Sequence, residues 1–269
     1  MKPMVFERRA MPDQRIDLSS LVPARLAGLD LKAIEALPVN TTRHALAVGD
    51  IFRVKRGEAG SIRILGATSR FDCVGAALDG GEIAVEGDAG ELAGRLMSGG
   101  ALTISGSAGP WAGSGLKGGR IAIGGNAGDW LAGPLPGEMA GMRGGILTIG
   151  GNAGEMAGDR LRRGIVTVGG STGRYPGSRM IAGTLIVGGK AGALPGYLMR
   201  RGTIFLRRAP DVLSPTFVEG GRGSGVFRQL MARELAKSGL AAGWIAGTSL
   251  RRLAGDTAVL GKGEVFLGR

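Results

Sequence analysis

The chain has 269 residues, of which 53 are glycine, and 34 Lys and Arg against 22 Asp and Glu give it a formal net charge of +12. A hydrophobic share of 43% is normal for a packed protein, and the single cysteine excludes an internal disulfide framework and indicates a reducing, cytoplasmic compartment. No stretch approaches the 18 or so consecutive apolar residues of a membrane span, and charges interrupt residues 1–18, so neither a span nor a signal peptide is expected.

Residues 1–59 do not follow the pattern of the residues after them. Apolar residues between Pro23 and Pro38 predict a short helix or turn, and residues 41–54 predict one or two strands. A stack of parallel strands needs its open end covered, because an exposed edge strand presents unpaired backbone groups. We therefore expect this segment to be a cap, and its extra length also suits a docking arm for another subunit.

Residues 60–208 repeat one short pattern. The glycine that follows each apolar pair recurs at intervals of 21, 19, 19, 26, 19 and 19 residues, at Gly66, Gly87, Gly106, Gly125, Gly151, Gly170 and Gly189. A fixed period near 20 residues is typical of a solenoid. The glycine density excludes a helix, since an interior glycine costs about 1 kcal/mol relative to alanine. Nineteen residues are also too few for the strand and helix that a dinucleotide-binding glycine motif requires.

Each repeat contributes to three apolar columns. The first consists of strand pairs with one exposed residue between them: Ile62/Ile64, Ile83/Val85, Leu102/Ile104, Ile121/Ile123, Leu147/Ile149, Val166/Val168, Leu185/Val187 and Ile204/Leu206. The second is Leu92, Trp111, Trp130, Met156, Tyr175 and Leu194. The third is Leu78, Met97, Leu116, Met142, Leu161, Met180 and Met199. Three inward columns separated by glycine corners predict an all-β fold, a parallel β-helix of about seven to eight rungs spaced by about 4.8 Å.

A seven-residue insertion lies between Gly125 and Gly151, around the sequence Pro134-Leu135-Pro136-Gly137. Two prolines predict a stiff loop that projects from one edge of the coil. Insertions of this kind are where a solenoid often makes specific contacts. A neutral insertion is the alternative, and the sequence does not distinguish the two.

Residues 209–269 are expected to form a second cap. Apolar residues at helical spacing predict an amphipathic helix over residues 224–238, with Ser224 as its N-terminal cap, packed on the end of the coil. Residues 250–253 read as a second helical turn or a loop, and residues 261–267 as a short strand.

Positive charge is concentrated in the second half of the coil, where residues 141–210 carry a net +9 against −3 for residues 61–140. Lys117, Arg143, Arg162 and Arg200 occupy equivalent positions, interrupted at Ile181, and Arg163 and Arg201 belong to the next column. Equivalent residues on adjacent rungs lie about 5 Å apart, so like charges repel there unless an anion faces them. These six residues are the candidate site for a polyanion or an acidic partner, and a solvated basic face is the alternative. A nucleic acid is not expected, because exposed aromatic residues do not alternate with the charges.

Catalytic side chains are scarce. His44 is the only histidine and Cys73 the only cysteine, which argues against a histidine metal site, a Ser-His-Asp arrangement or an iron–sulfur cluster in this chain. Cys73 is expected to be buried as a small apolar residue. We therefore expect no catalytic residue, no metal site and no cofactor in the chain itself.

The tandem units Gly119–Gly128 and Gly145–Gly154, of the form Gly-Gly-x-Ile-x-Ile-Gly-Gly-Asn-Ala-Gly, resemble the C-terminal glycine-repeat domain of the glutamate synthase large subunit. They equally resemble the C-type subunit of formylmethanofuran dehydrogenase and of the bacterial formyltransferase/hydrolase complex. The flanks favour the C-type family, and with them the resemblance covers most of the chain: Val48-Gly49-Asp50-Ile51-Phe52, Thr216-Phe217-Val218-Glu219-Gly220-Gly221 and Gly261-Lys262-Gly263-Glu264-Val265-Phe266-Leu267.

The resemblance implies a right-handed β-helix that acts as a structural subunit of a cytoplasmic one-carbon enzyme complex. The preferred member, the formyltransferase/hydrolase complex, transfers a formyl group from formyl-tetrahydromethanopterin to methanofuran and releases formate. Its implied partners are amidohydrolase-like and formyltransferase subunits, and the glutamate tail of a methanofuran-type carrier. The alternatives are the C-type subunit of an archaeal tungsten or molybdenum formylmethanofuran dehydrogenase, and a glutamate-synthase-like structural subunit. An excess of 27 Arg over 7 Lys suggests a GC-rich genome and thereby favours the bacterial complex.

Overall fold

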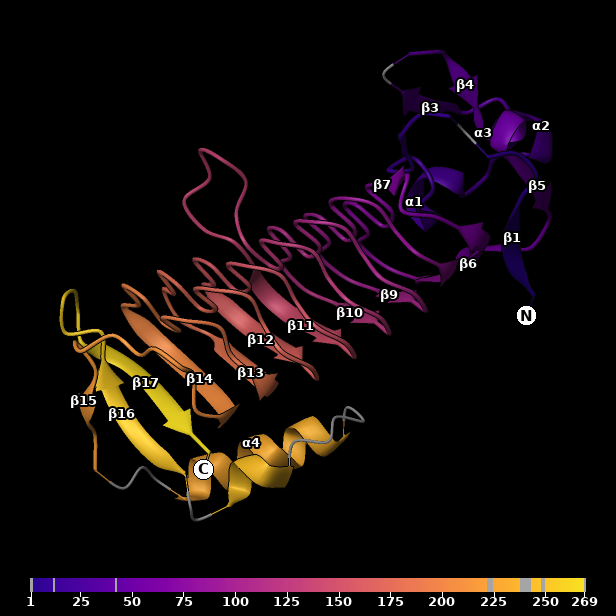
Figure 1. Ribbon diagram of the computed structural model, residues 1–269. Coiled ribbons are helices and arrows are strands. Elements are labelled where there is room, and N and C mark those ends of the chain that lie inside the picture. Colours follow the sequence, from indigo (N-terminus) through magenta and orange to yellow (C-terminus); the bar gives the residue numbers. More distant parts are fainter. Residues whose placement is uncertain are drawn as a thin grey trace.

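The structure is a computed structural model that describes residues 2–11, 13–41, 43–221, 225–237, 243–247 and 250–268. This part of the chain is mostly strands in one large, mostly parallel sheet, with few helices, which confirms the all-β prediction. Figure 1 shows an elongated stack of repeats with the two terminal segments at its opposite ends.

The centre of the sheet consists of parallel strands from successive repeats. They are β6 (Glu58–Ala67), β8 (Glu82–Gly87), β9 (Ala101–Ile104), β10 (Arg120–Ile123), β11 (Arg143–Ile149), β12 (Arg163–Val168), β13 (Thr184–Lys190) and β14 (Arg201–Arg208). Their register places equivalent residues side by side, so that Leu102 pairs with Ile121 and Ile121 with Leu147 across the insertion. All members of the first predicted column are buried, because the strands alternate and one face of the sheet lines the core.

The third predicted column is confirmed as well. All seven of its residues, from Leu78 to Met199, have no exposed surface. All seven belong to one buried apolar cluster that runs through the stack.

The second predicted column lies on the outside of the stack, and the inward prediction for it is wrong. We call Leu92, Trp111, Trp130, Met156, Tyr175 and Leu194 the outer ladder; they are half-buried, and every one has left-handed backbone, with φ between +57° and +61°. A left-handed residue breaks the alternation of an extended chain, so the next residue turns inward instead. Ala112 and Leu131 are accordingly the fully buried neighbours of the two tryptophans. The ladder amides donate to the next repeat, as Trp111 N does to Asp129 O at 2.9 Å.

The N-terminal segment extends the same sheet. Its elements are β1 (Pro3–Arg8), β2 (Ile16–Asp17), α1 (Pro23–Leu26), α2 (Leu31–Glu35), β3 (Pro38–Thr41), β4 (Leu46–Ala47), α3 (Val48–Ile51) and β5 (Phe52–Lys55). β1 lies between β5 and β6, while β2, β3 and β4 form a small sheet with β7 (Phe71–Asp72). The predicted single helix is two short ones, separated at Gly28, whose φ of +80° ends the first. Edge-to-face contacts of Phe52 with Phe6 and Phe71 fill the core at this end.

The C-terminal segment continues the sheet with a hairpin. β17 (Lys262–Leu267) pairs in parallel with β14 and antiparallel with β16 (Arg251–Gly255), which also pairs with β15 (Val218–Glu219). The strand predicted for residues 261–267 is thus confirmed. Residues 251–253 belong to β16, so neither a helical turn nor a loop is correct there. The ring of Phe217 is buried in the core at this end of the stack.

The predicted helix is present as α4 (Gly225–Lys237), and its proposed cap, Ser224, lies outside the described residues. It does not cover the end of the stack. Ala232 and Leu235 pack with the 3₁₀ helix η1 (Gly243–Ala246) on the outer face of the sheet, against Ile186, Phe205 and Phe266. These three strand positions are apolar on the outward side, which gives the helix a lateral surface to bury (Figure 1).

Candidate functional site

The insertion forms a loop, residues 133–141, that projects from one edge of the stack (Figure 1). Glu138 holds it: one carboxylate oxygen accepts from Arg95 Nη2 at 2.7 Å, and the other accepts from Leu135 N at 2.9 Å. Arg160 Nη1 donates to the Glu138 carbonyl at 2.9 Å. The hydrogen bond from Arg95 is the main cause that holds the pKa of Glu138 below its ordinary 4.5. The predicted projection of the loop is therefore confirmed, and side chains of neighbouring repeats bind it.

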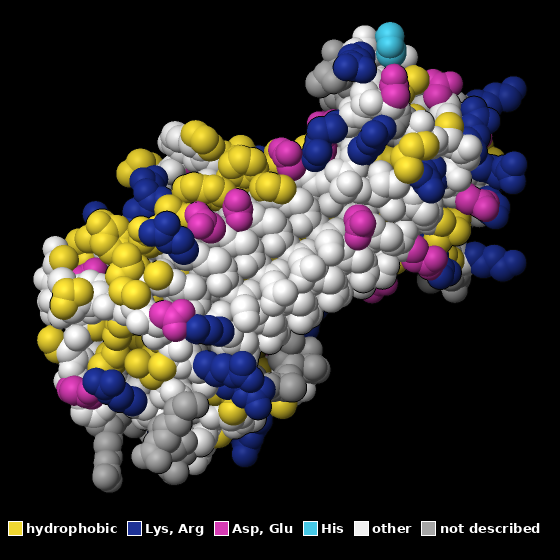
Figure 2. Space-filling view, viewed as in Figure 1, with side chains coloured by type: hydrophobic (Ala, Val, Ile, Leu, Met, Phe, Trp, Pro, Cys, Tyr) yellow, Lys and Arg dark blue, Asp and Glu magenta, His cyan; other side chains and the backbone are white. Residues whose placement is uncertain are grey.

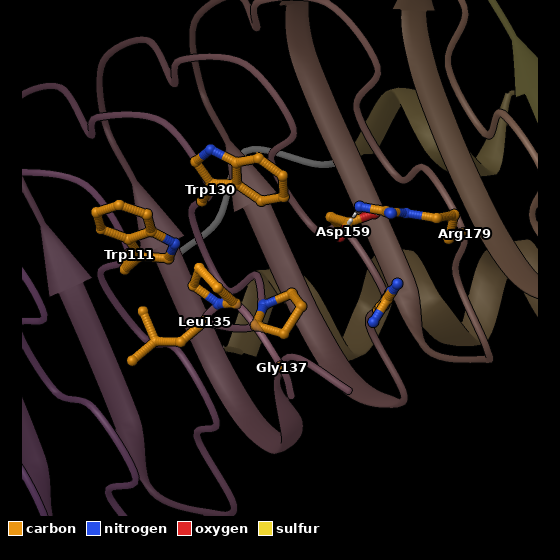
Figure 3. Close-up of a pocket in the computed structure, with 9 residues that line it drawn as sticks. Trp111, Trp130, Leu135, Gly137, Asp159 and Arg179 are labelled. Carbon is orange, nitrogen blue, oxygen red and sulfur yellow. Dashed lines mark hydrogen bonds and ion pairs between the residues drawn. The ribbon is translucent and has the colours of Figure 1, made fainter. Parts of the chain in front are cut away.

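A pocket of about 320 Å³ opens between this loop and the outer ladder. Figure 3 shows Trp111 and Trp130 on one side, Leu135 and Gly137 of the loop below them, and Asp159 with Arg179 at the far end. We call it the tryptophan pocket. Two tryptophan rings, two proline rings and Leu135 form its apolar walls, and Arg160 and Arg179 supply the polar edge.

Asp159 and Arg179 give that polar edge a fixed geometry. Asp159 is completely buried, and its two carboxylate oxygens accept from Arg179 Nε at 2.8 Å and Nη2 at 2.6 Å. Ser178 Oγ donates to the same carboxylate at 2.7 Å. Such a bidentate pair orients the guanidinium strongly.

A second hollow of about 470 Å³, which we call the arginine cleft, lies beside the tryptophan pocket and shares Arg160 and Arg179 with it. Three of the six predicted site residues, Arg143, Arg162 and Arg200, line the cleft. The neighbours that complete it are Met139, Ala140, Ile181, Leu198 and Val259. Arg162 and Arg200 form no ion pair with any carboxylate that the structure describes. The cleft thus presents uncompensated positive charge in a concave site.

The other three predicted residues are exposed but do not line the cleft. Lys117 lies one repeat before Arg143, Arg163 begins β12 opposite Arg143, and Arg201 begins β14 opposite Lys262. The register of β11 against β12 shifts between Arg143 and Ile146, and Arg143 therefore lies opposite Arg163. The structure therefore separates the predicted column into a cleft and a flanking basic surface.

Sequence reasoning missed Arg160 and Arg179. They stand 19 residues apart, at equivalent positions with φ of +48° and +51°. The 19-residue period alone could have shown that they occupy equivalent positions in adjacent repeats. The same period makes Asp159 and Ser178 equivalent.

A third hollow of about 330 Å³ continues the surface along Met156, Tyr175, Leu194 and Tyr197. It again includes Arg179, and the rings of Tyr175 and Tyr197 lie 5.9 Å apart. Figure 2 shows apolar side chains gathered in the second half of the stack, with Lys and Arg side chains among them. The three hollows thus form one surface that crosses several repeats.

Other reactive groups do not form a site in the described part of the chain. No three His, Cys, Asp or Glu side chains lie close enough together there to hold a metal ion. Cys73 is half-buried, and burial together with Asp17 and Asp72 raises the pKa of its thiol to about 12. Among the described residues, no helix has the length and apolar character needed to cross a membrane.

Fold and surface together define an all-β repeat protein that presents a basic and aromatic surface. No protein-family model matches the chain. It is 52% identical over 254 residues to the C-type subunit of the formyltransferase/hydrolase complex Fhc of Methylorubrum extorquens, and the match covers 94% of this chain and 95% of that relative. It also resembles a chain of the crystal structure of the complex FhcABCD from Methylorubrum extorquens with methylofuran. That match has a TM-score of 0.94 and 44% identity, and it covers 98% of this chain and 99% of the other.

An identity of this size over nearly the whole length shows the family. The chain belongs to the family of C-type subunits of the formyltransferase/hydrolase complex.

Proposed function

We propose that the chain is a non-catalytic scaffold subunit of a bacterial formyltransferase/hydrolase complex. In this role it holds the amidohydrolase-like and formyltransferase subunits that transfer formyl from formyl-tetrahydromethanopterin to methanofuran and hydrolyse formylmethanofuran to formate in formaldehyde oxidation. The observation that carries the proposal is the 52% identity to the C-type subunit of such a complex over 94% of the chain. A chain with one histidine and one cysteine, the latter with a raised pKa, suits a scaffold better than a catalyst.

The architecture we propose for this scaffold is a right-handed parallel β-helix of about seven to eight 19-residue rungs over residues 60–208, located in the cytoplasm. Residues 1–59 and 209–269 serve as its caps, and the first also docks on another subunit. Parallel pairing of β9 with β10, of β12 with β13 and of β13 with β14, each at an offset of 19 residues, supports the coil. A row of backbone bridges from Ala89 through Ala108, Ala127 and Ala153 to Thr172 supports a second side of it.

The scaffold role is tested by purifying the chain from its native cell under gentle conditions and identifying its companions by mass spectrometry. Amidohydrolase and formyltransferase subunits should co-purify, with formyl transfer and hydrolysis in the assembly and neither in the chain alone. A chain that purifies alone, or that catalyses either step alone, would overturn the proposal.

The arginine cleft favours a second role, in binding the glutamate tail of a methanofuran-type carrier. Five arginines line one cleft, and two of them, Arg162 and Arg200, have no described carboxylate partner. Lys117, Arg163 and Arg201 extend the basic surface at its edge and would attract an acidic tail over a longer range.

An oligoglutamate peptide is a direct probe for this role. Because exposed ion pairs contribute about 0.2–1 kcal/mol each, replacing Arg143, Arg162 and Arg200 with glutamine should weaken binding about tenfold at low salt. The same replacement of Lys117, Arg163 and Arg201 should have a smaller effect. The loss should grow as the salt concentration falls. Equal losses for the two sets, or a loss independent of salt, would contradict binding in the cleft.

A further inference from the structure

The tryptophan pocket is apolar and aromatic, unlike the basic column, and the proposed scaffold role gives it no function. Trp111 and Trp130 come from adjacent repeats, and left-handed backbone at both residues places their rings on the outer surface. The loop residues Pro134–Gly137 cover the rings from one side (Figure 3). An apolar hollow of about 320 Å³ between fixed rings has room for one large side chain and the backbone beside it.

Hydrogen bonds within the chain hold the loop wall of the pocket in place. Glu138 binds Arg95 through its carboxylate and Arg160 through its carbonyl, so the loop is attached to repeats on both sides of it. A rigid pocket loses little conformational entropy when it is filled, which favours tight binding per contact.

Trp111 supplies a directed polar group. Its indole Nε1 is buried and meets no hydrogen-bond acceptor among the described residues. Figure 3 shows the nitrogen edge of this ring turned toward the side on which Trp130 and Leu135 lie. Buried tryptophan N–H groups usually have an acceptor, because an unmade hydrogen bond is costly. Because this nitrogen has no solvent contact in the free chain, a partner's backbone carbonyl would reach it only after a small turn of the Trp111 ring.

The charge at the rim selects an acidic neighbour. Asp159 neutralises Arg179, whereas Arg160 donates to the Glu138 carbonyl, which carries no formal charge. Arg160 also lines the arginine cleft, where Arg143, Arg162 and Arg200 add further positive charge. A carboxylate next to the apolar side chain would therefore meet complementary charge.

The apolar surface around the tryptophan pocket also extends further than a small molecule would cover. Exposed apolar residues continue from the pocket in both directions, with 38% of Leu96, 78% of Met139 and 41% of Tyr197 accessible to solvent. Tryptophan, tyrosine and arginine are the residue types that contribute most at protein–protein contacts. A polypeptide partner covers such a stripe, whereas a small ligand would leave most of it in water.

We propose that the tryptophan pocket and its rim dock an extended segment of another subunit, in which a large apolar side chain fills the pocket and an adjacent carboxylate faces Arg160. The inference rests on the proposed scaffold function, since it needs a complex in which the partner is present.

The test uses the full chain in its native complex, with a photo-crosslinking amino acid in place of Leu135. The crosslinked peptide should come from another subunit and should carry an apolar residue next to Asp or Glu. A crosslink to a small molecule, or no crosslink within an intact complex, would overturn the inference.

Two substitutions test the energetics. Trp130→Ala should weaken association with the other subunits about 30-fold, as expected for an aromatic hot spot. Trp111→Phe keeps an aromatic ring but removes the N–H and part of the indole surface, and it should weaken the association about three- to tenfold. Leu135→Asp changes a half-buried loop side chain that lines the pocket but lies outside the core of the stack, and it serves where Trp130→Ala fails to fold. Leu230→Ala on α4 is the control: this apolar side chain is more exposed than the tryptophans and lies outside the surface, so its loss should change nothing.

The outcomes separate this inference from the scaffold role. A wild-type chain that brings no formyltransferase/hydrolase subunits contradicts the scaffold role. A wild-type chain that brings them, with Trp130→Ala and Leu135→Asp chains that bring them equally well, contradicts only the docking pocket.

Discussion

Arg179 covers the carboxylate of Asp159 with two donors, Nε at 2.8 Å and Nη2 at 2.6 Å, and leaves that carboxylate without solvent contact. The pair comes from adjacent repeats and lies where the tryptophan pocket and the arginine cleft meet. It therefore links the stability of the stack to the shape of the candidate site.

Arg179→Met should lower the free energy of unfolding by about 3 kcal/mol, because it leaves a buried carboxylate with Ser178 as its remaining hydroxyl donor. Urea unfolding followed by circular dichroism measures the loss. Arg174→Met is the matched control, since its exposed guanidinium contacts only the Tyr175 side chain among the described residues, and it should cost less than about 0.5 kcal/mol. Combining Arg179→Met with Asp159→Leu should recover part of the loss, and a double variant less stable than Arg179→Met would contradict this account.

Glu138 should make the attachment of the loop depend on pH. Its pKa is lowered in the folded chain, first by the Arg95 hydrogen bond, so its stabilisation is complete above the ordinary pKa of 4.5. The stabilisation is lost as the pH falls through the lowered value. The difference in unfolding free energy between wild type and Glu138→Gln should therefore be constant near neutral pH and shrink below 4.5. In an Arg95→Met background this pH dependence should largely disappear, and its persistence would assign it to another group.

Cys73 should react slowly in the folded chain. Burial is the main cause that raises its thiol pKa to about 12, so little of the reactive thiolate exists at neutral or mildly alkaline pH. Alkylation by iodoacetamide near pH 8, followed by intact mass, should be about 100-fold slower in native buffer than in denaturant. Equal rates in the two conditions would show that the thiol is accessible and ionises normally.

The outward position of the ladder makes a comparison of two leucines informative. Leu161→Ala removes a side chain with no exposed surface and should cost about 2–5 kcal/mol. Leu194→Ala removes a half-buried member of the outer ladder and should cost about 1 kcal/mol or less. Thermal unfolding of the two variants measures both losses of stability. Similar losses would show that the outer ladder is buried as fully as the core.

The sequence by itself determined the all-β class, the repeat and two of its three columns. Two local patterns are preserved by parallel stacking: the period-2 alternation at Ile121 and Ile123, and the recurrence of leucine or methionine at the position of Leu116. The flanking motifs indicated the family, and the column of basic residues indicated three of the residues that line the cleft.

Only the tertiary structure decided which way the outer ladder faces and which arginines gather. The left-handed φ at Trp111 goes with a hydrogen bond from its backbone N–H to the carbonyl of Asp129 in the next repeat, and the sequence of one repeat does not contain that partner. Arg160 joins the cleft for the same reason, because left-handed backbone turns it outward. α4 packs laterally because Phe205 and Phe266 stack on the outward face of β14 and β17, and that apolar patch exists only once the two strands are paired.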